Sequence, residues 1–249
     1  MKLPTIVLLV FLTSNCIAQD NKFALSVQIN TQEQVSYSHV TNYGGVFARE
    51  NNERDNYYSF SGVVKYNLKN NTSLRLKVGF SKLSFGSDTT YHDSTYETNS
   101  NQSAKQTNYH FALGIEKEII TGKVNLYVGF QTPVNIYGQT TYESLYEYHF
   151  ISTGVIWYSN QINGRQKNGF SIGLSGFTGF AFNITNRFAV FGEYSFAIMY
   201  AKIGGEDEFT SVSVQSGTIN KITVTTVNNK FEKFGVLEQV GSFGLSFKL

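Results

Sequence analysis

Six charged residues lie on segments in which apolar and polar residues alternate, and they are the side chains best suited to chemistry. Because successive side chains of a strand point to opposite faces, these charges fall on the face opposite the bulky apolar residues. If these segments enclose a narrow interior of low dielectric constant, charged side chains inside it must form ion pairs or shift their pKa values. We therefore expect a packed salt-bridge network that fills the interior, with a gate in a narrow conduit as the alternative. The six residues are Lys65, Arg75, Lys77, Glu116, Glu193 and Lys248.

Two further groups of residues could bind ligands. His110 shares the face of the charged set and is flanked by small residues, so we expect a hydrogen-bonded interior histidine. Asp88, His92, Asp93 and Glu97 fall close together in a polar segment and could bind a divalent cation weakly. A charged surface segment is usually only solvated, so we predict no metal and no cofactor.

A nucleophile beside a histidine is the requirement for a lipid-modifying enzyme. The candidate pairs are Ser38 with His39 and His149 with Ser152. Neither pair has a distinctive spacing, and a chain this rich in serine contains such pairs by chance. We predict no catalytic residues.

The totals limit the class of protein. The 249 residues are 41% hydrophobic and carry a net charge of +2 without a Lys/Arg cluster, so a nucleic-acid partner is not expected. Lys2, an apolar run over 6–12 and small residues at 16–18 predict a signal peptide over 1–18. Residues 19–249 then form one domain without a disulfide, because the chain's one cysteine is Cys16; lipidation of Cys16 is the alternative.

Eight segments alternate with a period of two and are separated by short and long connections in turn. This pattern predicts an all-β, eight-stranded, antiparallel up-and-down transmembrane barrel with short periplasmic turns and long extracellular loops. A hairpin over 211–224 and a strand extension near 149–158 are expected outside the membrane, and a ten-stranded barrel is the alternative. The strands are expected at 23–30, 60–68, 74–80, 109–116, 124–130, 170–182, 188–198 and 243–249, and the long loops at 35–56, 86–106, 138–167 and 203–235.

The bulk of the apolar set decides which face points outward. Phenylalanines recur on it in nearly every segment, whereas the opposite face is rich in Gly, Ser and Ala, which suit a narrow lumen. A soluble barrel with an apolar interior is therefore disfavoured. Tyr127, Phe177 and Phe191 are expected to point inward and narrow the lumen. An interfacial aromatic girdle is predicted at Tyr57, Tyr58, Tyr109, Tyr137 and Tyr200.

The last segment, Phe243 to Leu249, has apolar residues at every second position back from the end. In this the chain resembles the small outer-membrane β-barrels of Gram-negative bacteria, the OmpX- and OmpA-like proteins, and its composition resembles Bacteroidetes-type, PorT-like barrels. That family usually ends on Phe or Trp, whereas this chain ends on Leu249, with Phe247 two places earlier. The resemblance covers nearly all of 21–249 and rests on pattern rather than on a motif.

The resemblance implies an outer-membrane location, contact with outer-membrane lipid and insertion by the barrel-assembly machinery. An extracellular or periplasmic protein partner is a further expectation. We predict a non-catalytic structural, surface-interaction or export-accessory role. The alternatives are a narrow channel for small solutes and a lipid-modifying enzyme.

Overall fold

The computed structural model describes residues 22–30, 53–120, 122–151, 156–215 and 218–249, and its regular elements there are all strands in antiparallel pairs. The expected signal peptide and most of segment 35–56 lie outside the described residues. No described helix is long and apolar enough to cross a membrane. The strands are β1 (Phe23–Asn30), β2 (Glu53–Asn67), β3 (Thr72–His92), β4 (Tyr96–Ile120), β5 (Val124–Tyr137), β6 (Thr140–Phe150), β7 (Ile156–Gln166), β8 (Gly169–Asn183), β9 (Phe188–Gln215) and β10 (Thr218–Lys248).

Eight of these strands pair in a cycle, which we call the ring. Strands β1 to β5 pair in chain order, β5 pairs with β8, β8 with β9, β9 with β10, and β10 returns to β1. The hairpin of β6 and β7 stands outside this cycle, because β6 pairs with the first part of β4 and β7 with the last part of β9. The strands of the ring coincide with the segments selected by alternation.

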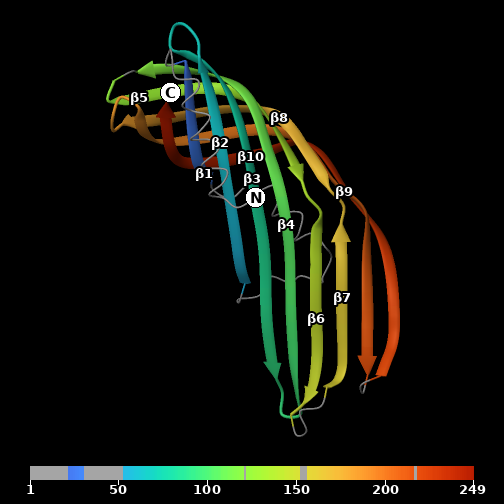
Figure 1. Cartoon of the computed structure of the whole chain (residues 1–249). Coiled ribbons are helices and arrows are strands. Elements are labelled where there is room, and N and C mark those ends of the chain that lie inside the picture. The colour runs from blue at the N-terminus through green and yellow to red at the C-terminus, as the bar shows by residue number, and fades with distance from the viewer. Residues whose placement is uncertain (1–21, 31–52, 121, 152–155, 216–217) are drawn as a thin grey trace.

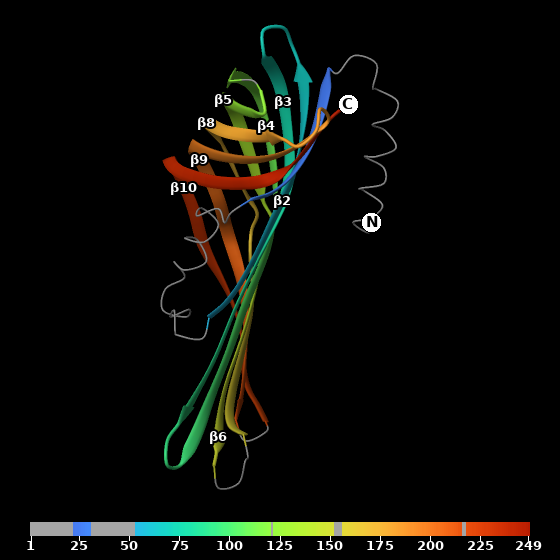
Figure 2. The same ribbon diagram turned by 90° about the vertical axis from the view of Figure 1, so that its left-hand side faces the viewer.

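A single-layered sheet continues from one end of the ring (Figures 1 and 2). This sheet extension consists of β6 and β7 with residues 84–105 of β3 and β4 and residues 207–228 of β9 and β10. The prediction of loops over 86–106, 138–167 and most of 203–235 is therefore wrong, whereas the hairpin predicted over 211–224 is confirmed by the pairing of β9 with β10. Residues 86–106 are largely polar on both faces and show no apolar alternation, yet their backbones pair continuously from the ring outward.

The other end of the ring carries the short turns. Asn70 and Asn71 occupy the left-handed region with φ of 60° and 56° between β2 and β3, which asparagine tolerates better than most residues. The two ends of the described chain meet at this level, because the amide of Leu249 donates to the carbonyl of Phe23 at 2.9 Å. The predicted short connections are thus confirmed.

The ring is apolar outside and polar inside. Leu76, Val78 and Phe80 on β3 point outward and are exposed, whereas Arg75, Lys77 and Ser81 on the same strand are buried in the lumen. Among the predicted girdle residues, Tyr58 and Tyr109 do point outward, but Tyr137 is buried and its hydroxyl lies 3.0 Å from Ser171 Oγ. Residue 137 is two places from Asn135, which faces the lumen, so strand periodicity turns its side chain inward.

Candidate functional site

Arg75 joins the charged side chains of the lumen. Its guanidinium donates to both oxygens of Glu193, at 2.8 and 3.1 Å, and to Glu116 Oε2 at 3.3 Å. All three side chains are almost wholly buried. A planar guanidinium suits this arrangement because it presents several donors in a fixed fork. Two carboxylates therefore converge on one cation inside the ring.

Lys65 completes the charge balance. Its ammonium lies 2.6 Å from Glu116 Oε1, so Lys65, Arg75, Glu116 and Glu193 carry two positive and two negative charges. The hydroxyl of Tyr127 donates to Glu193 Oε2 at 3.4 Å. A buried ion pair is stable only if its remaining hydrogen-bonding groups are satisfied, and this network largely meets that condition.

Two aromatic rings support the cations. Arg75 lies 4.1 Å above the centre of the Phe177 ring, and Lys65 lies 4.7 Å from the centre of the Tyr127 ring. Each ring covers a glycine on the neighbouring strand. A Cβ on Gly129 would come within 2.2 Å of Phe177, and one on Gly179 within 2.4 Å of Tyr127. Strand glycines thus make room for the rings that fill the lumen.

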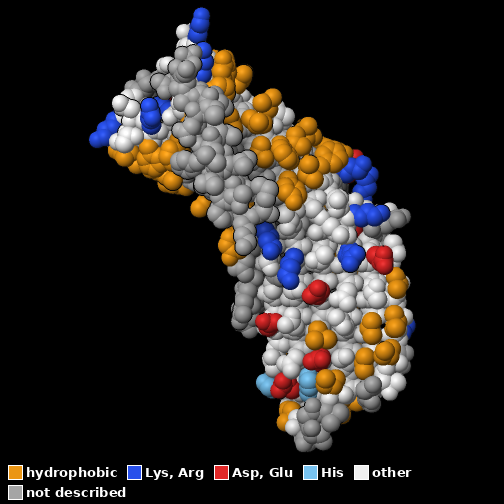
Figure 3. Space-filling model, in the orientation of Figure 1, with side chains coloured by type: hydrophobic (Ala, Val, Ile, Leu, Met, Phe, Trp, Pro, Cys, Tyr) orange, Lys and Arg blue, Asp and Glu red, His pale blue; other side chains and the backbone are white. Residues whose placement is uncertain are grey.

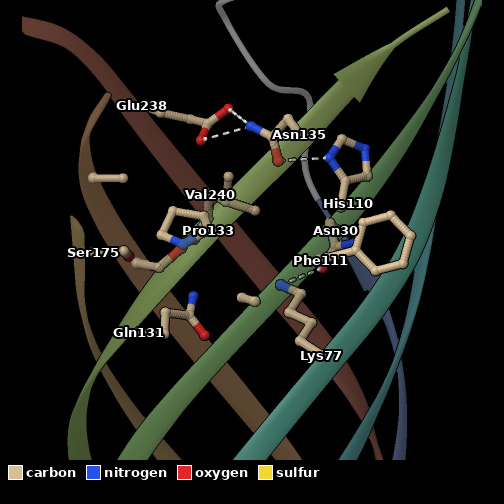
Figure 4. Close-up of a pocket in the computed structure, with 13 residues that line it drawn as sticks. Asn30, Lys77, His110, Phe111, Gln131, Pro133, Asn135, Ser175, Glu238 and Val240 are labelled. Atoms are coloured by element: carbon tan, nitrogen blue, oxygen red, sulfur yellow. Dashed lines mark hydrogen bonds between the residues drawn. The ribbon is translucent and has the colours of Figure 1, made fainter. Parts of the chain in front are cut away.

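A second polar layer lies nearer the sheet extension (Figure 4). His110 contacts Asn135 Oδ1 at 3.1 Å and Ser81 Oγ at 2.9 Å through its two ring nitrogens. The amide of Asn135 also donates to Glu238, at 3.3 and 3.4 Å. Lys77 Nζ lies 3.5 Å from Asn30 Oδ1 at the same level. The cavity between these side chains is only about 40 Å³, which is enough for one or two waters.

The structure brings together most of the predicted charge set but not all of it. Lys65, Arg75, Glu116 and Glu193 form one network, and Lys77 belongs to the second layer. Lys248 lies apart from both, beside Lys123 at the short-turn end of the ring. The sequence argument missed Glu238, because this residue falls just after a segment that was predicted to be a loop. His110 is hydrogen-bonded and buried as expected.

The candidates that fall on described residues do not assemble into a reactive site. His92 pairs with Glu97 at 3.2 Å and His149 with Glu147 at 3.3 Å, but the described residues hold no group of three His, Cys, Asp or Glu side chains in metal-binding geometry. Ser38, His39 and Ser152 lie outside the described residues. In the lumen network, by contrast, the ionised groups bind one another.

No family model matches the sequence, and no curated protein matches it. The fold is similar to several solved structures. Neisserial surface protein A is 12% identical with a TM-score of 0.35, the alignment covering 92% of this chain and 97% of that one. The outer membrane protein OprG from Pseudomonas aeruginosa is 10% identical with a TM-score of 0.41, covering 91% and 95%. The attachment invasion locus protein Ail of Yersinia pestis is 9% identical with a TM-score of 0.26, covering 90% and 95%.

Proposed function

We propose that the protein is an integral outer-membrane barrel of eight membrane strands, without catalytic activity, which presents its sheet extension outside the cell as an interaction surface. The observation that carries this proposal is the filled lumen below a long exposed sheet. A barrel whose interior is filled by its own side chains can hold the protein in the membrane but offers no room for a ligand. The surface that a partner can reach is then that of the sheet extension.

The outward face of the ring supports the membrane location. Leu113, Phe130 and Leu174 are each more than 60% exposed, and they lie on three different strands. Large apolar side chains exposed around a whole ring would be unstable in water but are favourable against lipid hydrocarbon. Outer-membrane lipid is thus the first partner we propose.

The inner face argues against the channel alternative. Arg75 bridges to Glu193 across the lumen, and the cavity of about 40 Å³ in the next layer is too small for a solute. An eight-stranded interior is just wide enough to be filled by side chains. A conduit would require the Arg75 network to open, which would leave charges unpaired at low dielectric.

The orientation follows from the two ends of the ring. Short turns and both ends of the described chain lie at one end, which is the periplasmic end in outer-membrane barrels. We propose that β10, with its final Phe247 and Leu249, is the strand that the barrel-assembly machinery binds during insertion. The sheet extension would then project from the cell surface.

Two epitope insertions test this arrangement. One is placed after Ser94, in the connection between β3 and β4, and the matched one after Asn71, in the turn between β2 and β3. Antibody should label the Ser94 insertion on intact cells and the Asn71 insertion only after the outer membrane is permeabilised. Labelling in the reverse order, or of neither insertion in a folded protein, would refute the proposed topology.

A further inference from the structure

The two faces of the sheet extension differ in charge. The outer face continues the lipid-facing side of the ring and carries charged side chains on β3, β4, β6, β7 and β9, several of which are visible in Figure 3. The inner face continues the lumen side. On β3, β4, β6, β7 and β9, the charged side chains in the rows from Ser87 outward lie on the outer face. Asp207, on the inner face of β9, lies nearer the ring and is buried. The outer-face charges include Asp88, Glu97, Lys105, Glu143, Glu147 and Arg165.

Tyrosines, hydroxyls and amides make up the corresponding inner face. One row across the paired strands runs through Tyr91, Thr98, Tyr148, Tyr158 and Gln215. The adjacent row, two residues nearer the ring, has Ser100, Tyr146 and Asn160 at its centre. Neither row contains Asp, Glu, Lys, Arg or His on these five strands. On β10 the second row continues to Lys221, opposite Ser213. The inner face therefore has many hydrogen-bonding groups and one lysine on β10, with no charge on the other five strands.

Four of the tyrosines form a continuous aromatic cluster. The ring centre of Tyr148 lies 5.0 Å from that of Tyr146 and 6.0 Å from those of Tyr96 and Tyr158. These rings are partly exposed, and Tyr96 is 38% exposed. A tyrosine ring offers an apolar face and a polar edge together. The cluster can thus contact C–H groups with its rings and hydroxyl groups with its edges.

We propose that this inner face binds a neutral polysaccharide. Sugar rings present C–H faces and many hydroxyls but no charge, which matches aromatic rings among serine, threonine, asparagine and glutamine. An anionic glycan or a nucleic acid requires a set of Lys or Arg side chains, and the two rows supply one lysine, Lys221 on β10. Protein interfaces are enriched in Arg as well as Tyr, and the two rows contain no Arg.

The saccharide site rests on the proposed role of the sheet extension as an interaction surface, but it can be tested separately from the location of the protein. Trp157 is the chain's one tryptophan, it lies beside Tyr158 in the sequence, and its ring lies 6.2 Å from Phe150 on the inner face. Its fluorescence therefore reports binding to the cluster. The full chain in detergent is titrated with dextran, mannan and galactan as neutral probes and with polygalacturonate as the anionic probe.

At least one neutral probe should shift the Trp157 emission saturably, and the affinity should change by less than about twofold between low and high salt, because no ion pair forms. Tyr148→Ala should weaken binding by about tenfold or more. Tyr148→Phe should retain most of the affinity, since the ring remains. Glu147→Gln is the matched control, because its side chain lies on the outer face of the same strand, and it should bind normally.

Three results would overturn the saccharide site. These are no shift with any neutral probe, binding only of polygalacturonate, or equal binding by Tyr148→Ala and the unchanged protein. Capture of a protein through this face, without polysaccharide binding, would also replace the proposal. The two proposals can fail separately. If the Ser94 insertion is not labelled on intact cells but dextran, mannan or galactan still binds, the surface location is rejected and the saccharide site stands.

Discussion

Arg75 and Glu193 lie 118 positions apart in the chain and are joined by two hydrogen bonds of 2.8 and 3.1 Å. They stand on β3 and β9, and three strands of the ring separate these two on either side. The pair therefore links opposite walls of the ring. Because cross-strand backbone bonds connect neighbours only, this link constrains the ring in a direction that the sheet itself does not.

Removing the carboxylates should destabilise the ring. Glu116→Gln combined with Glu193→Gln leaves Arg75 buried and Lys65 partly buried without counter-charges. Breaking a buried pair such as that of Arg75 costs about 3–5 kcal/mol. We expect a large drop in the thermal unfolding temperature in detergent, with planar-bilayer currents still near the closed level. Glu143→Gln, on the exposed outer face of β6, is the control and should unfold normally. Large new currents without a loss of stability would instead favour a gate.

The contact between Gly129 and Phe177 should be intolerant of a methyl group. In Gly129→Ala, the new Cβ would lie 2.2 Å from the Phe177 ring and 2.3 Å from the carbonyl oxygen of Ile115. Overpacking of this kind typically costs about 1–3 kcal/mol, and Arg75 would also lose the position of its supporting ring. Gly62→Ala is the control, because its nearest neighbour would be 3.8 Å away. Equal unfolding temperatures for the two variants would contradict this packing argument.

The sequence predicts the ring well because its strands are apolar on one face. A residue such as Phe80 between Gly79 and Ser81 identifies both the strand and its outward face, and the structure agrees at that position. Most of the sheet extension lacks this signal, although residues 211–224 carry it. Thr98 and Asn99 are both polar, so alternation cannot distinguish a strand with two solvated faces from a loop. Pairing between distant segments, such as β7 with β9, decides the outcome there.

In the candidate site, too, alternation predicts the position of some residues but not their partners. Lys65, Arg75 and Glu116 could be assigned to the lumen because each lies in an alternating segment. Which charged side chains form ion pairs depends on the tilt and register of the strands, and neither can be predicted from alternation. Lys248 therefore looked like a neighbour of Glu193, although the residue opposite Glu193 on β10 is Ser242. The tyrosine cluster was not anticipated, since its members come from β4, β6 and β7 in segments predicted to be loops.

Asn135 should be essential to the second lumen layer. It accepts or donates hydrogen bonds to His110, Ser171 and Glu238. In Asn135→Ala these groups lose their shared partner, and each hydrogen bond lost in this way typically costs about 0.5–1.5 kcal/mol. Thermal unfolding in detergent should show this loss, whereas Asn101→Ala, at an exposed position on β4, should not. An unchanged unfolding temperature would mean that the layer is not held by Asn135.

The hydrogen bond between Tyr146 and Tyr148 should be visible in an alkaline titration. Tyr146 Oη donates to Tyr148 Oη at 3.0 Å, and this bond, with a smaller effect of burial, raises the pKa of Tyr146 from 10.0 to about 12. Since the folded pKa is the higher one, the stabilising contribution is complete below pH 10.0 and is lost as the pH rises toward 12. The phenolate absorbance of the full chain minus that of Tyr146→Phe should show one ionisation near 12. Tyr148→Phe removes the acceptor and should lower the pKa of Tyr146 toward its ordinary value. A Tyr146 pKa already at the ordinary value in the unchanged protein would contradict the hydrogen bond.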